Sequence, residues 1–178
     1  MTSLTLLSAT ASAMLGPVTL EPLDVPPAVP LAGRLLVAAP VLTDPHFART
    51  VVLLLDHDED GTVGLVLNRP SHVPVGAVLP VWDGRTTGMD VLFTGGPVSE
   101  DSALALGLLP GPHDGPEPDG FRRVAGPFGL VDLETDPDTT VARLDALRIY
   151  AGYAGWGPGQ LDDEIAFPSK PYRREDLA

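Results

Sequence analysis

Two short segments carry the residue types that could do chemistry in this chain. Asn68-Arg69 and Thr94-Gly95-Gly96 each follow an apolar run that is typical of a β-strand. An arginine fork beside backbone N–H groups that glycine leaves accessible can hold a carboxylate or a phosphate. We therefore take Asn68, Arg69, Thr94, Gly95 and Gly96 as candidate residues of a small-anion site.

The same residues also have a purely structural interpretation. Asn68, followed by Pro70, is typical of a turn, and Arg69 can pair with one of the many acids of this chain. Glycines also allow backbone with positive φ. Turns are the more frequent use of such residues, and finding Arg69 bidentate to a buried acid would remove the ligand interpretation.

A third candidate, Trp156, lies in a glycine-rich run between Gly152 and Gly159. The glycines can allow close backbone packing against one aromatic anchor. An exposed Trp would instead favour a protein interface, where Trp and Tyr are enriched. The exposure of Trp156 decides between these alternatives.

No segment carries a recognisable catalytic motif. Cysteine is absent, which excludes disulfides, thiolate catalysis and Cys-ligated zinc. The four histidines lack metal-binding spacing, and neither a Gly-x-Ser-x-Gly elbow nor a Walker lysine is present. Asp56–Gly61 imitates the start of a calcium loop, but Leu67 stands where the bidentate Glu belongs, so we predict a hairpin turn. We expect no enzyme, no cofactor and no metal.

The composition indicates a globular protein whose acidic charge disfavours binding to polyanions. Of the 178 residues, 44% are hydrophobic and 20% are charged, with a formal net charge of −13. This charge disfavours direct nucleic-acid binding and anionic membranes, but it is compatible with a basic protein partner. No run of about 20 apolar residues predicts a membrane-spanning helix. We expect a cytoplasmic protein of unknown oligomeric state.

The elements that must position the candidate residues are mostly strands. The sequence predicts a strand buried on both faces over 33–40, a hairpin over 50–56 and 62–67, a short helix over 73–79, strands over 91–94, 121–125, 129–133 and 149–156, and helices over 138–148 and 158–165. Residues 103–109 fit either a helix or a strand, and 110–120 read as a loop. Since regular βαβ alternation is missing, we expect a compact mixed-sheet α/β (α+β) domain with a few flanking helices.

Three segments divide the chain. Residues 1–30 are rich in proline and read as a flexible extension. Residues 31–166 form the predicted domain, and 167–178 form an atypical tail.

The ordered motifs of the domain resemble the YqgE/AlgH family. They are Leu35–Pro40 with Asp44, Pro45 and Phe47, the hairpin through His57 and Gly64 to Asn68-Arg69-Pro70, Phe93–Val98, and Tyr150–Trp156 with Pro158–Leu161. The resemblance implies a compact mixed-sheet domain, bacterial and cytosolic, with no established catalytic residues or cofactor. It also implies that the domain normally continues beyond residue 165, so we expect a truncated domain with an unpaired sheet edge or an exposed apolar face that favours aggregation.

We expect the chain to act without catalysis, through a protein partner or an undefined ligand, with regulatory consequences. The alternative is a small-anion-binding domain or an enzyme that uses Asn68, Arg69 and the Gly95-Gly96 turn. One family member is labelled a transcriptional regulator of alginate synthesis, and direct transcriptional regulation is the weakest alternative because of the acidic charge.

Overall fold

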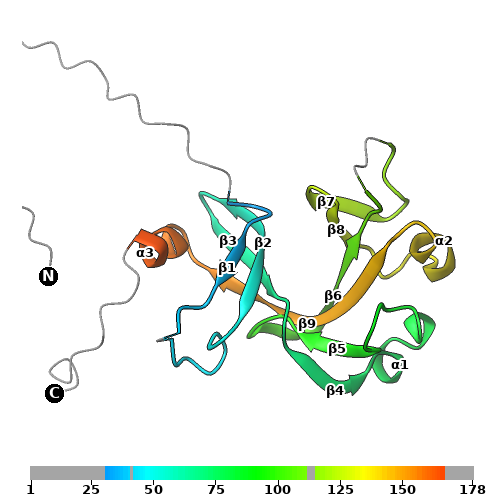
Figure 1. Ribbon diagram of the computed structural model, residues 1–178, viewed down its shortest axis with the longest axis horizontal. Helices are drawn as coiled ribbons and strands as arrows, with labels where there is room; N and C mark the ends of the chain where they lie inside the picture. Colours follow the sequence, from blue (N-terminus) through cyan, green and yellow to red (C-terminus); the bar gives the residue numbers. More distant parts are fainter. Residues whose placement is uncertain (1–30, 41, 112–114, 167–178) are drawn as a thin grey trace, which may run out of the picture.

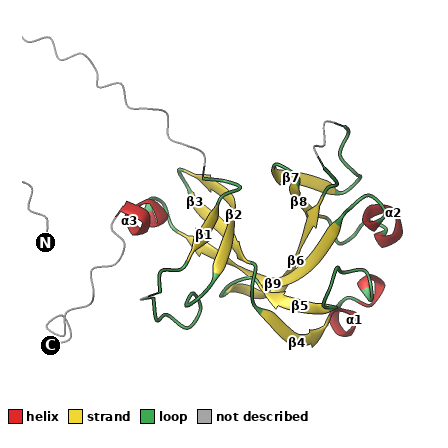
Figure 2. Ribbon diagram, in the orientation of Figure 1, coloured by secondary structure: helices red, strands yellow, loops and turns green. Residues whose placement is uncertain are grey.

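The computed structural model describes residues 31–40, 42–111 and 115–166. Its strands are β1 (Leu35–Val37), β2 (Val51–Asp58), β3 (Gly61–Val66), β4 (Pro70–Pro74), β5 (Val91–Thr94), β6 (Val98–Leu108), β7 (Phe121–Ala125), β8 (Phe128–Val131) and β9 (Ala146–Trp156). The helices are α1 (Val75–Val78), the 3₁₀ turn η1 (Pro80–Trp82), α2 (Pro137–Val141) and α3 (Gln160–Ala166). A curled sheet with few helices results (Figures 1 and 2), which confirms the predicted α+β fold.

Strand β9 lies at the centre of the sheet. The strand order is β1-β2-β3-β9-β6-β8-β7, and β5 pairs with both β4 and β9. Only the β5–β9 pair is parallel among the described strands, so the sheet is mixed, as expected. The register places Leu106 opposite Arg148 and Phe93 opposite Tyr150.

The predicted hairpin is present as β2 and β3. The carboxylate of Asp58 accepts the N–H groups of Asp60 and Gly61 at 2.9 and 3.2 Å, which closes the turn. Gly61 has a φ of +144°, and a Cβ there would lie 2.5 Å from the carbonyl oxygen of Trp156. Only glycine fits this position, so the acidic run is a hairpin turn, as the sequence predicts.

Strand alternation divides the buried side chains between the two faces of the sheet. On one face, Leu147 and Ile149 of β9 join a cluster that α1, η1 and the segment after α2 cover. Near α3, Trp156 and Leu161 belong to a second cluster. On the opposite face, Tyr150 belongs to a third cluster, with Leu53, Leu65, Phe93 and Leu106. The first two clusters have helical cover, and the third lies inside the curl of the sheet.

The predicted helix over 138–148 is wrong in its second half. Helix α2 ends at Val141, and β9 begins at Ala146. Leu144 and Leu147 still reach the same buried cluster as Val141, but from a turn and from a strand. Pairing of β9 with β6 therefore overrides the helical spacing of these apolar residues.

The predicted strand over 33–40 is shorter and more exposed than expected. Strand β1 covers three residues at the sheet edge, where Leu35 and Val37 are 59% and 68% exposed. Only Leu36 packs against a buried cluster. The apolar run therefore marks an edge strand and not a strand buried on both faces.

The remaining elements follow the predictions with small shifts. The ambiguous segment 103–109 belongs to β6, and β4 is a strand that the sequence did not predict. The predicted loop 110–120 has neither helix nor strand at its described positions. The predicted extension 1–30 and tail 167–178 lie outside the described residues.

Candidate functional site

Asn68 and Arg69 hold the loop that precedes β2. The guanidinium of Arg69 donates to the carbonyl oxygens of Pro45 and Ala48 at 2.8 and 3.1 Å. Asn68 accepts the N–H of Val51 and donates to the carbonyl of Arg49, at 3.0 and 2.9 Å. Arg69 is therefore bidentate to the backbone and not to an acid, and both side chains have polar partners within the protein.

Thr94 and Gly95 lie beside Arg69, and their backbone N–H groups already donate hydrogen bonds to neighbouring segments of the chain. The N–H of Thr94 donates to the carbonyl of Arg69, and the N–H of Gly95 donates to the carbonyl of Ala151, both at 2.8 Å. Gly95 and Gly96 are buried, and a Cβ at Gly96 would collide with the backbone of Tyr153. The glycines allow close strand packing here, and the Gly95 amide does not point to an open anion site.

Trp156 is 8% exposed and packs near Phe47, whose ring centroid lies 5.8 Å away. Its indole N–H donates to Glu164 of α3 at 3.2 Å. This burial fits the packing interpretation of the glycine-rich run. The structure thus places Trp156 beneath α3, where its ring packs against Phe47 of the loop that Arg69 holds.

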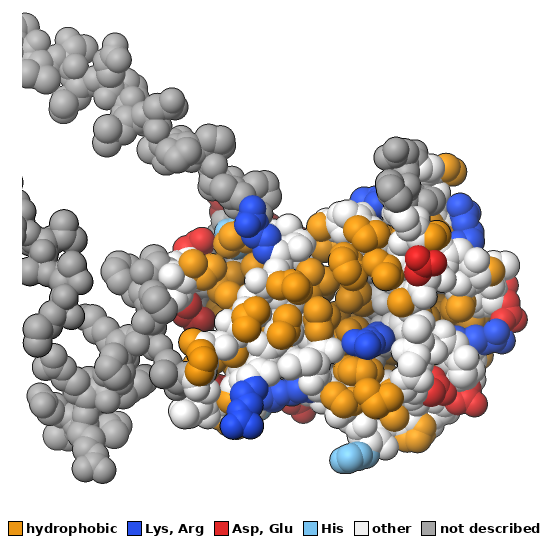
Figure 3. All heavy atoms as spheres, in the orientation of Figure 1, with side chains coloured by type: hydrophobic (Ala, Val, Ile, Leu, Met, Phe, Trp, Pro, Cys, Tyr) orange, Lys and Arg blue, Asp and Glu red, His pale blue; other side chains and the backbone are white. Residues whose placement is uncertain are grey.

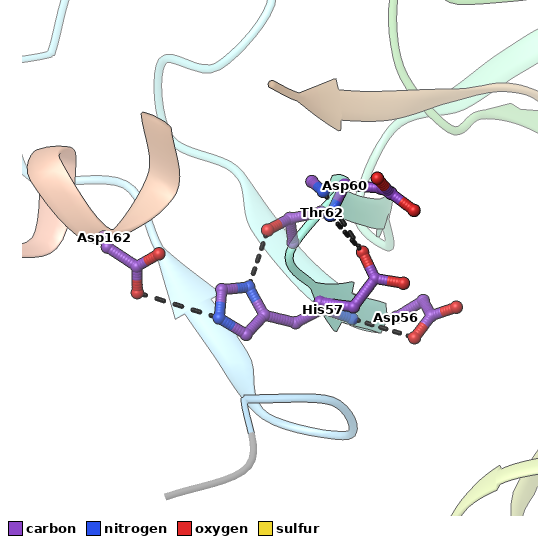
Figure 4. A network of polar contacts seen from close by, with 7 residues as sticks. Asp56, His57, Asp60, Thr62 and Asp162 are labelled. Carbon is purple, nitrogen blue, oxygen red and sulfur yellow. Dashed lines mark hydrogen bonds and ion pairs between the residues drawn. The ribbon is translucent and has the colours of Figure 1, made fainter. Parts of the chain in front are cut away.

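A polar network at the turn of the hairpin was not foreseen from the sequence (Figure 4). The His57 ring contacts Thr62 through Nδ1 at 2.7 Å and Asp162 of α3 through Nε2 at 3.7 Å. A hydroxyl, an imidazole and a carboxylate in series resemble a nucleophile with its base and orienting acid. Thr62 is 4% exposed, however, so the network connects the hairpin to α3 and offers no accessible nucleophile.

The face of the sheet opposite α1 and α2 carries a partly exposed apolar surface. We call it the apolar face and define it by side chains that are partly or fully exposed around the third buried cluster: Leu55, Leu67, Leu104, Leu108, Phe128 and Leu130. Figure 3 shows hydrophobic side chains gathered across the middle of the molecule. An exposed apolar face was expected from the sequence only as the result of a truncated domain end, and that expectation stays a prediction.

A hollow of about 170 Å³ opens in the apolar face. Its lining consists of Leu67, Thr87, Leu106, Gly107, Leu108, Phe128, Ala146, Leu147, Arg148 and Tyr150. The lining is mostly hydrocarbon, and Arg148 is its one charged residue. Such a surface can take up an apolar group by the hydrophobic effect and can orient it by one charge.

Arg148 and Tyr150 give the hollow its polar character. The Arg148 guanidinium lies 4.8 Å from the centre of the Phe93 ring, in a cation–π contact. Burial raises the pKa of the Tyr150 phenol above 10.0, while the neighbouring Arg148 acts in the opposite direction. The phenol is therefore neutral at physiological pH, and Arg148 supplies the only charge of the hollow.

The family is decided by comparison with known proteins. A sequence model described as AlgH-like matches residues 35–169 of this chain. The chain belongs to the AlgH-like family. The UPF0301 protein SCO2948 of Streptomyces coelicolor is a relative with 57% identity over 136 residues, which are 76% of this chain and 70% of the relative.

Two solved structures share the fold. The crystal structure of protein DIP2367 from Corynebacterium diphtheriae matches with a TM-score of 0.72 and 35% identity, over 78% of this chain and 72% of that chain. The solution structure of the AlgH protein from Pseudomonas aeruginosa matches with a TM-score of 0.58 and 30% identity, over 78% and 74% of the two chains. Within residues 31–166 as described, this AlgH-like chain has no helix long and apolar enough to cross a membrane.

The residues of the hollow were missed because no motif marks them. Leu104, Leu106 and Leu108 alternate along β6, and Arg148 and Tyr150 alternate along β9. This alternation would have revealed one shared face, but residues 103–109 were ambiguous and 138–148 were predicted as a helix. The two-residue alternation of a strand was present in both segments, but helical spacing of the apolar residues obscured it.

Proposed function

We propose that this AlgH-like protein is a non-enzymatic binding protein of the cytoplasm, which acts by docking a protein partner on the apolar face. The observation that carries the proposal is the hollow, where a partly exposed apolar surface surrounds the single charge of Arg148. Contiguous apolar surface of this kind is typical of interaction sites. A regulatory effect would follow from occupancy of this face.

The geometry supports the small-anion alternative less well. The Arg69 guanidinium and the Asn68 amide already have backbone partners. An anion there would have to replace these hydrogen bonds and release the loop before β2. Binding at the apolar face requires no such loss.

Site-specific photocrosslinking in cells tests the proposal. A photoreactive phenylalanine analogue is placed at position 128, which is 37% exposed beside the hollow, or at position 89, where Met89 is an exposed apolar control at 54%. We expect a discrete protein adduct from position 128 and none from position 89. Equal labelling at both positions, or no adduct at 128, would contradict a binding function of this face.

A further inference from the structure

We propose that the hollow receives a short amphipathic helix of the partner protein, with one apolar side chain in the hollow, one carboxylate on Arg148 and basic residues on its outer side. This inference rests on the binding function proposed above and adds the chemistry of the partner. Four features carry it: the size of the hollow, the pairing state of Arg148, the register of the sheet and the charge of the chain.

The size of the hollow favours a single anchoring side chain. Its volume of about 170 Å³ is below the range of about 300–1,000 Å³ that is common for sites of drug-sized ligands. Leu106, Leu108 and Phe128 line it with hydrocarbon. One large apolar side chain fills such a space, as anchors do when an amphipathic helix lies in a groove.

The position of Arg148 favours a carboxylate next to that anchor. Arg148 is exposed, its hydrogen-bonding partner Tyr150 is uncharged, and none of the ion pairs among the described residues involves Arg148. Its guanidinium lies above the Phe93 ring, at the solvent-exposed side of the apolar face. A docked apolar anchor would exclude water from an incoming carboxylate there, and charge-assisted hydrogen bonds are strong where water is excluded.

The register of the sheet favours a helix as the docked element. Leu106 in the hollow lies directly opposite Arg148, and cross-strand neighbours are about 5 Å apart. Side chains at i and i+4 of a helix are spaced by about 5–6 Å, so one helix face can reach both. Strand addition would require a free edge, whereas β6 and β9 each have neighbours on both sides near the hollow.

The charge of the chain determines the outer side of the partner. A net charge of −13 repels a second copy and an acidic protein, while it attracts basic residues that face away from the hollow. The partner helix is therefore apolar with one acid on its docked side and basic on the other. A second copy of this chain is the less favourable occupant.

A set of synthetic peptides tests this inference on the full chain. The probe is a labelled helical peptide with Leu and Phe at i and i+4, one Glu at i+3, and Lys along the opposite side. One matched peptide carries Gln in place of Glu, and another carries Ser in place of Phe. Fluorescence anisotropy measures each affinity, and thermal melting confirms that every protein variant is folded.

We expect Arg148→Gln to lower the affinity for the Glu peptide by about tenfold and to leave the affinity for the Gln peptide unchanged. The control Arg143→Gln removes the same charge at an exposed residue outside the hollow, and it should change neither affinity. Phe128→Ser should lower the affinity for the Glu peptide and the Gln peptide, but not the affinity for the Ser peptide. Arg148→Glu should regain binding to a peptide in which Lys replaces the Glu.

Equal losses for Arg148→Gln and Arg143→Gln would show that only general charge attracts the probe, and would overturn the inference. Self-association of the protein at neutral pH, where its net charge of −13 is present, that Phe128→Ser abolishes would identify a second copy as the occupant and would also overturn it. If crosslinking at position 128 succeeds while no peptide binds, the helix inference fails and the binding function stands. If both experiments fail, both proposals fall.

Discussion

Tyr150 is the residue at which the apolar face becomes sensitive to alkaline pH. Burial raises the pKa of its phenol above 10.0, so the folded chain holds this proton more tightly than the unfolded chain. The resulting contribution to stability is present below about pH 10 and is lost as pH rises through the raised pKa. Tyr150 therefore stabilises the fold only as a neutral side chain.

We predict that Tyr150→Phe makes the free energy of unfolding less dependent on pH above about pH 10, because Phe has no proton to lose. Urea unfolding at a series of alkaline pH values measures this slope. Tyr153→Phe serves as the control, since Tyr153 is only half-buried. Identical slopes for the wild-type chain and Tyr150→Phe would show that ionisation of this phenol is not linked to folding.

Arg69 lends itself to a test that separates its structural role from anion binding. We predict that Arg69→Ala lowers the free energy of unfolding by about 1–3 kcal/mol, because the carbonyls of Pro45 and Ala48 lose their donors. Arg69→Lys should recover only part of the loss, since an ammonium lacks the planar fork.

Phosphate distinguishes the two roles of Arg69. A structural role predicts the same melting temperature of the wild-type chain with and without added phosphate at matched ionic strength. Stabilisation by phosphate that disappears in Arg69→Ala would instead support the small-anion alternative. Sodium sulfate at matched ionic strength controls for general salt effects.

At the residue scale, local chemistry was easier to predict than partners. The acidic run of the hairpin was predicted as a turn because Asp and Gly serve turns by short-range hydrogen bonds. The partners of Arg69 lie 24 and 21 residues away in the chain, and a single sequence does not indicate such contacts. The hollow around Arg148 depends on the pairing of β6 with β9, and the alternation that marks this face was missed because residues 103–109 were ambiguous and 138–148 were predicted as a helix.

At the element scale, α3 is connected to the hairpin and to β9 by a few side chains. His57 reaches Asp162, Trp156 donates to Glu164, and Leu161 is buried beneath the helix. Helix α3 has only seven residues, and a helix this short depends on tertiary contacts for its stability. Loss of one polar contact should therefore loosen α3 before it affects the sheet.

We predict that His57→Ala increases the rate of hydrogen exchange in the α3 amides several-fold, and lowers global stability by about 0.5–1.5 kcal/mol. Mass spectrometry of deuterium uptake measures this effect segment by segment. His72→Ala is the matched control, because His72 is exposed on β4. Equal uptake in α3 for both variants would show that the His57 contacts do not hold this helix.

Element types were predictable where local signals agreed and failed where tertiary pairing decided. The β2–β3 hairpin has alternating apolar residues and a glycine-closed turn, so its local signals agree. Val141, Leu144 and Leu147 have helical spacing, yet β6 pairs with Leu147 and extends the chain there. The edge position of β1 was equally invisible, since an apolar run does not reveal how many neighbours a strand has.

At the scale of the whole molecule, two opposing properties determine self-association. The apolar face attracts other copies through burial of hydrocarbon, and the net charge of −13 repels them. Lowering the pH toward the isoelectric point near 4.4 removes the repulsion while the apolar face remains. The protein should therefore be most prone to associate in mildly acidic solution.

We predict that light scattering rises as the pH falls toward 4.4, and that Phe128→Ser shifts this onset to lower pH or reduces its size. Met89→Ser removes an exposed apolar side chain outside the hollow and should have a smaller effect. Scattering that is equal for the two variants would show that association does not use the apolar face.

The central position of β9 also affects the order in which the protein can fold during synthesis. This strand supplies Ile149, Tyr150 and Trp156 to three separate buried clusters, although it is the last strand of the described chain. Until it leaves the ribosome, β3 and β6 lack the neighbour between them, and their apolar side chains stay open to wrong contacts. Ribosome-bound chaperones should therefore protect this nascent chain until the residues of β9 have emerged.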